Sequence, residues 1–404
     1  MKKKRLLVLG AGEAQLQIIR TAKKLNIYTI VCDNRSELEG SKIADKYYNI
    51  DYMSRKDIIE IARIEEIDGV ISNSEPAMHN VAWVSSELNL PGNSEKSIEL
   101  LTSKIEFRKL QESAGEYFPK SFLVDTKDKL WKAVEEIGYP FVIKPMLSSG
   151  TRGTTVVEYF DLDLIENAYF QCSRFSRNKI VVVEEYVKMN SLVAYDAEIF
   201  VHGNEILWDG MYASIRDCDA PMIPVMESLP LGLPKHKELL VKESITNLIR
   251  HAGIVLGEYN AETYFTEEEK VFVIEINPRQ GGNHIPELVY EHSGIDFTAL
   301  LCTSAVGDND RFNEVKNKTR DFSYVTMYVV FSKFDGIYKG TELSDEIMPF
   351  VRWYQDNAEI GTEIHKKENA GDALAYVRME FETIEQQKMY MNNVGKHIKP
   401  MIEV

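Results

Sequence analysis

Short apolar runs and helical patterns alternate along the first 95 residues of the chain. Four runs of the strand type lie at residues 5–9, 28–31, 47–50 and 69–72. Apolar residues at the spacing of one helix face occur between them and after them, as in 55–65 and 77–88. Regular strand–helix alternation is typical of a parallel sheet that is covered by helices on both faces. We therefore predict an open parallel α/β domain over residues 1–95.

From residue 96 onward the pattern becomes a mixture of helices and longer strands. It predicts helices over 96–113, 127–137 and 235–252, and strands over 119–124, 139–145, 155–158, 180–183, 195–200 and 205–211. Residues 217–234 are rich in proline and lack periodicity, so we predict a loop that borders the substrate pocket. Strand-like runs after residue 322 and a helix over 384–398 predict a small α+β cap. The fold class is thus α/β and α+β, with a core over 96–306, a mobile part of it at about 118–188, and a cap over 307–404.

Acidic and amide side chains interrupt one predicted β-hairpin, which starts at Gly257 and returns through Asn277. Glu262 lies in its first strand, while Glu275 and Asn277 are two residues apart in the second and leave the same face. Oxygen donors on paired strands are the ligands that Mg²⁺ prefers. Arg279 follows on that face, and its forked donors suit a phosphoryl or carboxylate oxygen. A solvated acidic hairpin would explain a single glutamate, but the isoleucines flanking Glu275 indicate a buried strand.

A lysine, Lys144, interrupts the apolar run 139–145. An unpaired ammonium in a buried strand is very costly, so it needs a counter-charge, which nucleotide phosphates would supply. The segment that follows is small and polar, and its backbone N–H groups suit anionic oxygens, with one arginine adding charge. It differs from a P-loop and no helix follows it. Its residues are Ser148, Ser149, Gly150, Thr151, Arg152 and Gly153.

The N-terminal domain carries two further candidate sites. The turn Gly10-Ala11-Gly12, with Asp33 about twenty residues later, is similar to a dinucleotide fingerprint, but Gln15 stands at the position of the third glycine. Two hypotheses remain open: an NAD site, or a nucleotide-free domain that keeps the turn for packing or substrate binding. Glu75 lies just beyond the carboxyl end of the fourth strand, so it is a candidate substrate ligand, although helix capping explains it equally well.

Composition and charge narrow the classes of partner that the protein is expected to bind. A chain of 404 residues with 44% apolar residues is expected to form two or three globular domains. A net charge of −16 argues against a nucleic-acid partner. Four scattered cysteines predict free thiols, with no zinc site or disulfide framework. The basic start leads into a glycine turn rather than a cleavage site, and no run approaches a membrane span, so we expect a cytoplasmic protein.

The sequence EINPRQGG, after a strand that bears a glutamate, resembles the metal-binding end of ATP-grasp carboxylate–amine ligases. Residues 96–113 contain a lysine–arginine helix opening that is similar to the same core, and YPFVIKP with the small loop after it resembles the phosphate-covering segment. The layout is closest to L-amino acid ligases, with carbamoyl-phosphate synthase-like and formate-using purine-pathway ligases next. The resemblance implies a two-subdomain core, bound ATP and two Mg²⁺ ions, for which Mn²⁺ could substitute.

The resemblance also implies roles for individual residues. Lys104 and Lys144 would hold the α- and β-phosphates, the 148–153 loop would close over the β/γ end, and Glu262, Glu275 and Asn277 would bind the metal. Arg279 would stabilise the transferring phosphoryl group and the acyl phosphate, and Lys144 and Arg152 would be further catalytic residues. Asn283 and His284 would lie near the acyl acceptor. The adenine hinge would be Glu184, Glu185, Tyr186 and Val187. The acid that usually binds the ribose is absent a few residues later, and Asp196 and Glu198 are candidate substitutes.

The activity implied is ligation of a carboxylate, in the first place an amino acid, to an amine through an acyl phosphate, with release of ADP and phosphate. Its partners would be small molecules, and a homodimer is common among such enzymes. Three alternatives remain open from the sequence: an ATP-grasp phosphotransferase that stops at phosphoryl transfer, an NAD-dependent oxidoreductase that uses the N-terminal glycine turn, and a non-catalytic nucleotide-binding module.

Overall fold

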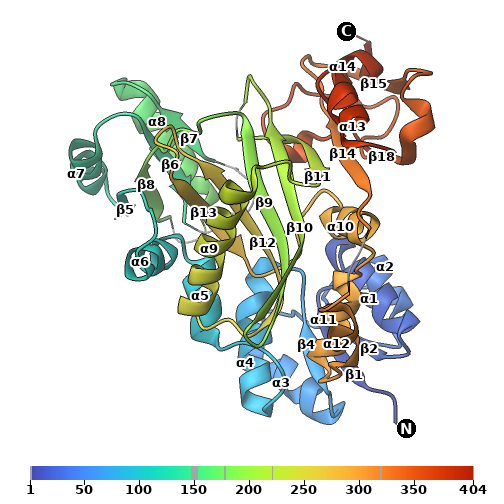
Figure 1. Cartoon of the computed structure of the whole chain (residues 1–404). Coiled ribbons are helices and arrows are strands. Elements are labelled where there is room, and N and C mark those ends of the chain that lie inside the picture. Colours follow the sequence, from blue (N-terminus) through green and yellow to red (C-terminus); the bar gives the residue numbers. More distant parts are fainter. Residues whose placement is uncertain (1, 147–152, 177–178, 221, 319–320, 404) are drawn as a thin grey trace.

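The computed structural model describes residues 2–146, 153–176, 179–220, 222–318 and 321–403. Its N-terminal sheet has the strand order β3-β2-β1-β4, and its pairs are parallel. Helices cover both faces, as predicted (Figure 1). The elements are β1 (Arg5–Leu9), α1 (Glu13–Lys24), β2 (Tyr28–Cys32), α2 (Glu39–Ile43), β3 (Lys46–Tyr48), α3 (Arg55–Ile64), β4 (Gly69–Ile71), the 3₁₀ turn η1 (Glu75–Ala77) and α4 (Met78–Leu88).

The centre of the molecule is an eight-stranded sheet of order β13-β12-β9-β10-β11-β14-β18-β16, whose pairs are antiparallel. Apolar residues of the opposite sheet faces pack on two helix groups, α5, α6 and α9 on one side and α10 and α11 on the other. The strands are β9 (Val193–His202), β10 (Glu205–Arg216), β11 (Pro224–Leu229), β12 (Leu256–Phe265), β13 (Val271–Asn277), β14 (Tyr324–Val330), β16 (Val351–Asp356) and β18 (Ala375–Phe381). The helices are α5 (Glu95–Thr102), α6 (Lys104–Ala114), α9 (Lys235–His251), α10 (Ile285–Ser293), α11 (Phe297–Ala305) and α12 (Asp310–Val315).

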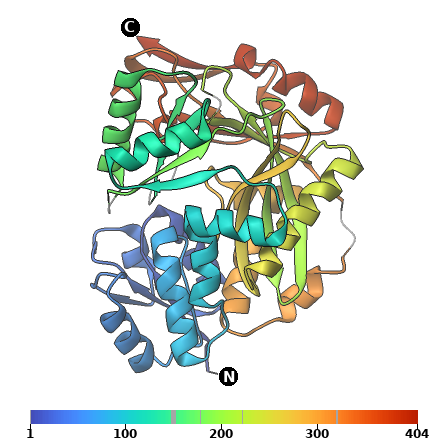
Figure 2. The ribbon, with the colours of Figure 1, turned by 90° about the vertical axis from the view of Figure 1, so that its left-hand side faces the viewer.

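A third, smaller sheet stands to one side of the large one, above the N-terminal domain (Figures 1 and 2). Its order is β5-β8-β6-β7, and its apolar core is closed by two helices. The elements are β5 (Ser121–Val124), α7 (Lys127–Ile137), β6 (Phe141–Pro145), β7 (Thr155–Val157), α8 (Leu162–Phe175) and β8 (Val181–Glu185). This unit corresponds to the part that we expect to be mobile, and we call it the lid.

The C-terminal part completes the large sheet and adds a small one of order β17-β15-β19. Because β14, β16 and β18 continue the large sheet, the backbone pairing runs across the division expected at residue 307. The remaining elements are β15 (Gly336–Leu343), η2 (Met348–Phe350), β17 (Glu363–Ile364), η3 (Ala370–Asp372), α13 (Ile384–Met391), α14 (Val394–His397) and β19 (Ile398–Glu403).

Three sequence predictions of elements are corrected by the structure. The expected helix over 96–113 is two helices, because Ser103 adopts an extended conformation and its hydroxyl caps α6 at Glu106 N. The expected loop over 217–234 contains β11, whose backbone pairs with β10 and β14. The expected helix over 384–398 ends at Met391 and resumes as the single turn α14.

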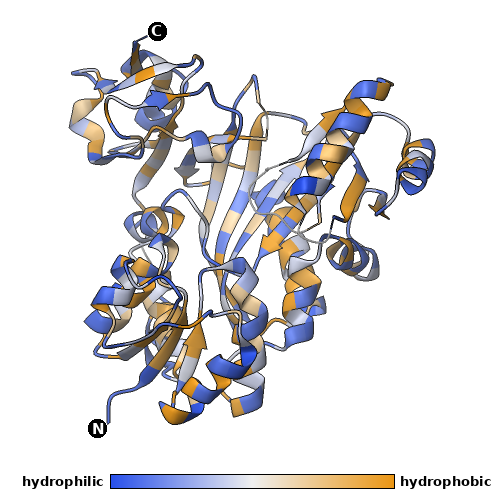
Figure 3. Cartoon of the chain, turned by 180° about the vertical axis from the view of Figure 1, so that it is seen from behind, coloured by the Kyte–Doolittle hydropathy of each residue, from blue (hydrophilic) through white to orange (hydrophobic). Residues whose placement is uncertain are grey.

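Apolar residues gather on the strands and on the helix faces that turn toward them, while the outer helix faces are polar (Figure 3). The sheet architecture thus has the mixed α/β and α+β character that the sequence predicts. Within the residues that the structure describes, no helix combines the length and the apolar character needed to cross a bilayer.

Candidate active site

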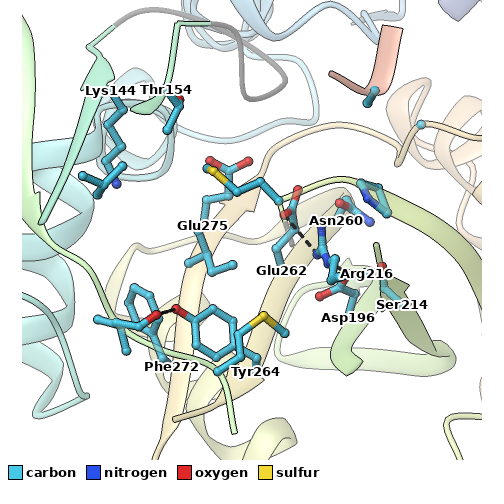
Figure 4. Close-up of a pocket in the computed structure, with 18 of the residues that line it drawn as sticks. Lys144, Thr154, Asp196, Ser214, Arg216, Asn260, Glu262, Tyr264, Phe272 and Glu275 are labelled. Atoms are coloured by element: carbon cyan, nitrogen blue, oxygen red, sulfur yellow. Dashed lines mark hydrogen bonds and ion pairs between the residues drawn. The ribbon is translucent and has the colours of Figure 1, made fainter. Parts of the chain in front are cut away.

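A cavity of about 370 Å³ opens where the lid, the large sheet and the N-terminal domain meet. Figure 4 shows Lys144 and Thr154 on one side of it, Glu275 in the middle, and Glu262, Asp196 and Arg216 on the other side. The residues predicted from sequence that line it are Glu75, Lys104, Lys144, Glu184, Glu185, Tyr186, Val187, Asp196, Glu262, Glu275, Arg279 and Asn283. Elements far apart in the chain therefore contribute to one space.

The two strand glutamates of the predicted metal site face each other directly. Glu262 on β12 is the cross-strand partner of Glu275 on β13, just before a bulge at Thr263. Burial and the neighbouring Glu275 raise the pKa of Glu262. Burial also disfavours charge on Glu275, but the Lys104 ammonium and the Asn277 amide hold the pKa of that carboxyl below its ordinary value. Two half-buried carboxylates held close together favour a divalent cation between them.

Asn277 lies beside this pair rather than at the cavity surface. Its Nδ2 donates to Glu275 Oε1 at 3.0 Å, and its side chain is buried. Asn260, its partner on β12, does line the cavity. The structure thus brings the three predicted metal residues together and gives Asn277 a hydrogen bond that orients the Glu275 carboxylate.

Lys144 has a counter-charge within the protein. This corrects the expectation that nucleotide phosphates supply the counter-charge of its ammonium. Its ammonium contacts Glu184 Oε1, and the same carboxylate accepts from Arg108 Nε at 2.9 Å and from Arg108 Nη2 at 3.2 Å. Burial lowers the pKa of Lys144 to about 8, although Glu184 opposes that shift. Burial alone would raise the pKa of Glu184, but Arg108 and Lys144 hold it well below its ordinary value. The carboxylate predicted to contact adenine is therefore used within the protein.

The segment 185–187 borders an apolar part of the cavity. Tyr264 donates its hydroxyl to Val187 O at 2.6 Å and meets Phe272 edge to face, with ring centroids 5.3 Å apart. Met189 and Ile274 complete this apolar lining. Flat apolar surfaces in a cavity are suited to a planar heterocycle.

The loop after β13 folds back against the large sheet. Gly281 donates its N–H to both oxygens of Glu198, at 3.0 and 3.1 Å, and a Cβ at Gly281 would stand 2.9 Å from Glu198 Oε2. The Glu198 carboxylate is thus used internally and is absent from the residues that line the described cavity, whereas Asp196, the other candidate for the ribose contact, does line it. The bend places Arg279 and Asn283 at the cavity.

His284 does not line the described part of the cavity, which corrects one predicted substrate contact. Its ring packs edge to face on Trp353 and Tyr376, with centroids 4.8 and 5.4 Å away. His284 has a positive φ of 59° at the start of α10, and its side chain lies against the C-terminal strands. The sequence gives no sign of this partner because the two strands are about 70 residues or more further along the chain.

The N-terminal domain contributes Glu75, whose pKa is raised by burial and by Glu275. The glycine turn has a different role from a dinucleotide site. Asp33, the acid that would bind the ribose of NAD, accepts the Ala11 N–H at 2.9 Å and pairs with the Arg35 guanidinium at 2.8 Å. The Gln15 side chain lies 3.1 Å from where a Gly10 Cβ would be. These contacts favour the packing hypothesis for this turn.

Sequence reasoning named Asp196 but missed its polar neighbours Arg216 and Glu227 on the middle strands of the sheet. Arg216 Nη2 lies 3.3 Å from Asp196 Oδ2 and 3.6 Å from Glu262 Oε2, and Glu227 on β11 also lines the cavity. Burial raises the pKa of Asp196 to about 6 and that of Glu227 to about 7, although Arg216 opposes both shifts. The signal that could have indicated this group is the presence of charged residues at positions of otherwise apolar strands. The loop residues Ser148, Ser149, Gly150, Thr151 and Arg152 lie outside the described residues, whereas Gly153 and Thr154 lie within them.

Comparisons with known proteins bear on the core of the chain and on its overall fold. Residues 103–308, about half of the chain, match the family "Carbamoyl-phosphate synthase L chain, ATP binding domain". An uncharacterized protein of Sinorhizobium fredii is 28% identical over 63% of this chain and 52% of its own. A formate-dependent phosphoribosylglycinamide formyltransferase of Sulfurisphaera tokodaii is 27% identical over 46% of this chain and 48% of its own. The chain thus spans about half the length of these two curated relatives.

Among solved structures, the L-amino acid ligase from Bacillus licheniformis is similar over 100% of both chains, with a TM-score of 0.81 and 17% sequence identity. An identity this low supports a shared fold and leaves the substrate open.

Proposed function

The chain belongs to the carbamoyl-phosphate synthase L chain ATP-binding family, within the ATP-grasp superfamily that its motifs resemble, and from this membership we propose that it joins a carboxylate to an amine with ATP. The carboxylate would be an amino acid. A carboxylate is a poor electrophile, so ATP would first convert it to an acyl phosphate with release of ADP. The amine would then attack the acyl carbon, and phosphate would leave.

The proposed nucleotide site uses the lid side of the cavity. The base would lie against Met189, Tyr264 and Ile274, with the backbone of residues 185–187 at its edge. Lys104 and Lys144 would neutralise the phosphates. We also propose that the lid moves relative to the large sheet, since substrates must enter a cavity that both units enclose.

The proposed metal site uses Glu262 and Glu275. Their fit to Mg²⁺ rests on the donor set: two opposed, half-buried carboxylates with an adjacent asparagine, where burial and the neighbouring Glu275 raise the pKa of Glu262. Magnesium bound there would neutralise phosphate oxygens. Arg279 would hold the oxygens of the carboxylate substrate or of the transferring phosphoryl group.

The observation that carries the proposal is the direct pairing of Glu262 with Glu275 in the same cavity as Lys104, Lys144 and Arg279. Positioning and charge neutralisation account for most of the catalysis of phosphoryl transfer, and this set supplies both. No other chemistry is required of the protein in the first step.

The test is an ADP-release screen over amino acids and small carboxylates, alone and paired with amines, in the presence of Mg²⁺. Hydroxylamine is included because it forms a hydroxamate from an acyl phosphate. Glu275→Gln should lose at least 10³-fold in ADP release, while the matched control Glu268→Gln, an exposed glutamate in the turn of the same hairpin, should not change it. Equal activity of Glu275→Gln and the control would refute the metal site. ADP release without any hydroxamate would favour a phosphotransferase, and no ADP release with any substrate would favour a non-catalytic nucleotide-binding module.

A further inference from the structure

A glutamate that the phosphoryl-transfer chemistry does not need lies at the far side of the cavity. Glu227 is 2% exposed and lines the cavity from β11. Its Oε1 accepts from Asn283 Nδ2 at 2.9 Å. Its Oε2 is buried and has no hydrogen-bond partner among the residues that the structure describes. A buried carboxylate with half of its hydrogen-bonding capacity unused is costly unless something else completes it.

The nearest basic side chain is already shared by other acids. Arg216 lies close enough to Glu227 to oppose the effect of burial on its pKa, yet its guanidinium contacts Asp196 and Glu262 instead. The excess of acid extends over the whole cavity. Its described lining contains seven carboxylates and only four basic side chains. Two Mg²⁺ ions and ATP⁴⁻ together bring no net charge, so their binding would leave the excess of carboxylates unchanged. A further cation, carried by a substrate, would reduce that excess.

A second buried glutamate, Glu258, lies beside a much smaller cavity than Glu227 does. Glu258 also has one oxygen without a partner in the described structure, but it lines a separate cavity of only about 50 Å³. That space has room for ordered water and not for a substrate. Glu227 instead lines the 370 Å³ cavity, whose lining also includes the apolar residues Pro224 and Ile285.

We propose that Glu227 binds a protonated amino group of a substrate, held by Oε2 while Asn283 keeps the carboxylate oriented through Oε1. An ammonium has three donors and no acceptor, which matches an unpaired carboxylate oxygen. The inference rests on the proposed ligase function and names its substrate class: at least one substrate enters as an ammonium ion. The group belongs either to the carboxylate substrate, which is then an amino acid, or to the attacking amine before it loses its proton.

The test compares each amino acid with its amine-free analogue, such as alanine with propionate, in wild type, Glu227→Gln and Glu227→Asp. Glu291→Gln is the matched control, because Glu291 also has a buried oxygen without a described partner but lies outside the described cavity lining. Hydroxamate formation with hydroxylamine reports the carboxylate substrate alone, and coupled product formation reports the amine. In one of these two reactions Glu227→Gln should raise the KM of the amine-bearing substrate at least 100-fold and leave the KM of ATP within twofold. Glu227→Asp should retain the selectivity with weaker binding.

A rise in the hydroxamate reaction assigns the ammonium to the carboxylate substrate, and a rise only in coupling assigns it to the amine. Unchanged KM values in both reactions would overturn the proposal. If no substrate releases ADP at all, the ligase proposal fails independently. The subsite is then tested by thermal shift of the protein saturated with Mg²⁺ and a non-hydrolysable ATP analogue. Stabilisation by amino acids that requires both the amine and Glu227 supports it, and its absence overturns it.

Discussion

Replacing Glu184 by glutamine should destabilise the protein by about 3–5 kcal/mol, the usual effect of removing one partner from a buried ion pair. The Glu184 side chain is only 4% exposed. It accepts two hydrogen bonds from Arg108, contacts Lys144 and accepts from Ser121 Oγ at 2.5 Å. Glutamine keeps the shape but removes the negative charge, so two buried cations would face each other without compensation.

The structural position of this cluster makes the effect a test of how the lid is attached. Arg108 belongs to α6, while Glu184 and Lys144 belong to the lid strands β8 and β6. Arg108 Nη1 also donates to Ile274 O on β13, at 2.9 Å. One guanidinium therefore joins β13, which carries the proposed metal ligand Glu275, to the lid. Loss of the Glu184 charge should weaken both that junction and the lid itself.

The assay is urea unfolding followed by far-ultraviolet circular dichroism, with hydrogen exchange of the β6 and β8 amides as a local readout. Glu106→Gln on the same helix is the control, because its pair with Lys109 is exposed to solvent and should change stability by less than about 0.5 kcal/mol. The loss of stability caused by Lys144→Met should be smaller in the Glu184→Gln variant than in the wild type. In the variant the Lys144 ammonium has already lost its counter-charge, and its removal leaves Arg108 without a second cation beside it. A destabilisation by Glu184→Gln below about 1 kcal/mol would refute the view that this carboxylate compensates the two cations.

Three further outcomes follow from the structure. Chelation of divalent cations should abolish ADP release, Mn²⁺ should restore it, and activity that survives chelation would contradict the metal site. Burial raises the pKa of Asp196 to about 6 and of Glu227 to about 7, so the native state binds more protons than the unfolded chain in this range. Without Mg²⁺ or nucleotide, Tm should therefore rise as pH falls from about 8 to about 5, and a Tm that falls steadily over that range would contradict these assignments. Gly281→Ala should cost about 1–3 kcal/mol because its Cβ meets Glu198, whereas Gly282→Ala, with no atom within 4 Å, should be tolerated, which urea unfolding of both variants checks.

The local part of the site could be predicted from the sequence because alternation along a strand fixes which side chains share a face. The spacing of Glu275 and Asn277 placed them together, and the short turn of the hairpin brought Glu262 opposite. The regular strand–helix alternation likewise gave the parallel N-terminal sheet, and the lysine in an apolar run pointed to a compensated buried charge at Lys144.

Contacts between distant segments could not be predicted in the same way. The partner of Lys144 is Glu184, 40 residues away on a neighbouring strand, and its identity depends on sheet order rather than on periodicity. Glu227 reaches the cavity because β11 pairs with β10 and β14. The proline-rich segment that contains β11 lacks the apolar alternation from which a strand is predicted. Ser103 ends one helix and caps the next through a single backbone change, which the apolar spacing on either side does not reveal.

A crystal structure with Mn²⁺ and a non-hydrolysable ATP analogue tests the central claim most directly. The account predicts anomalous density of Mn²⁺ between the carboxylates of Glu262 and Glu275, with the triphosphate beside it and within reach of Lys104 and Lys144. A triphosphate bound elsewhere, or both carboxylates turned away from the metal, would contradict it.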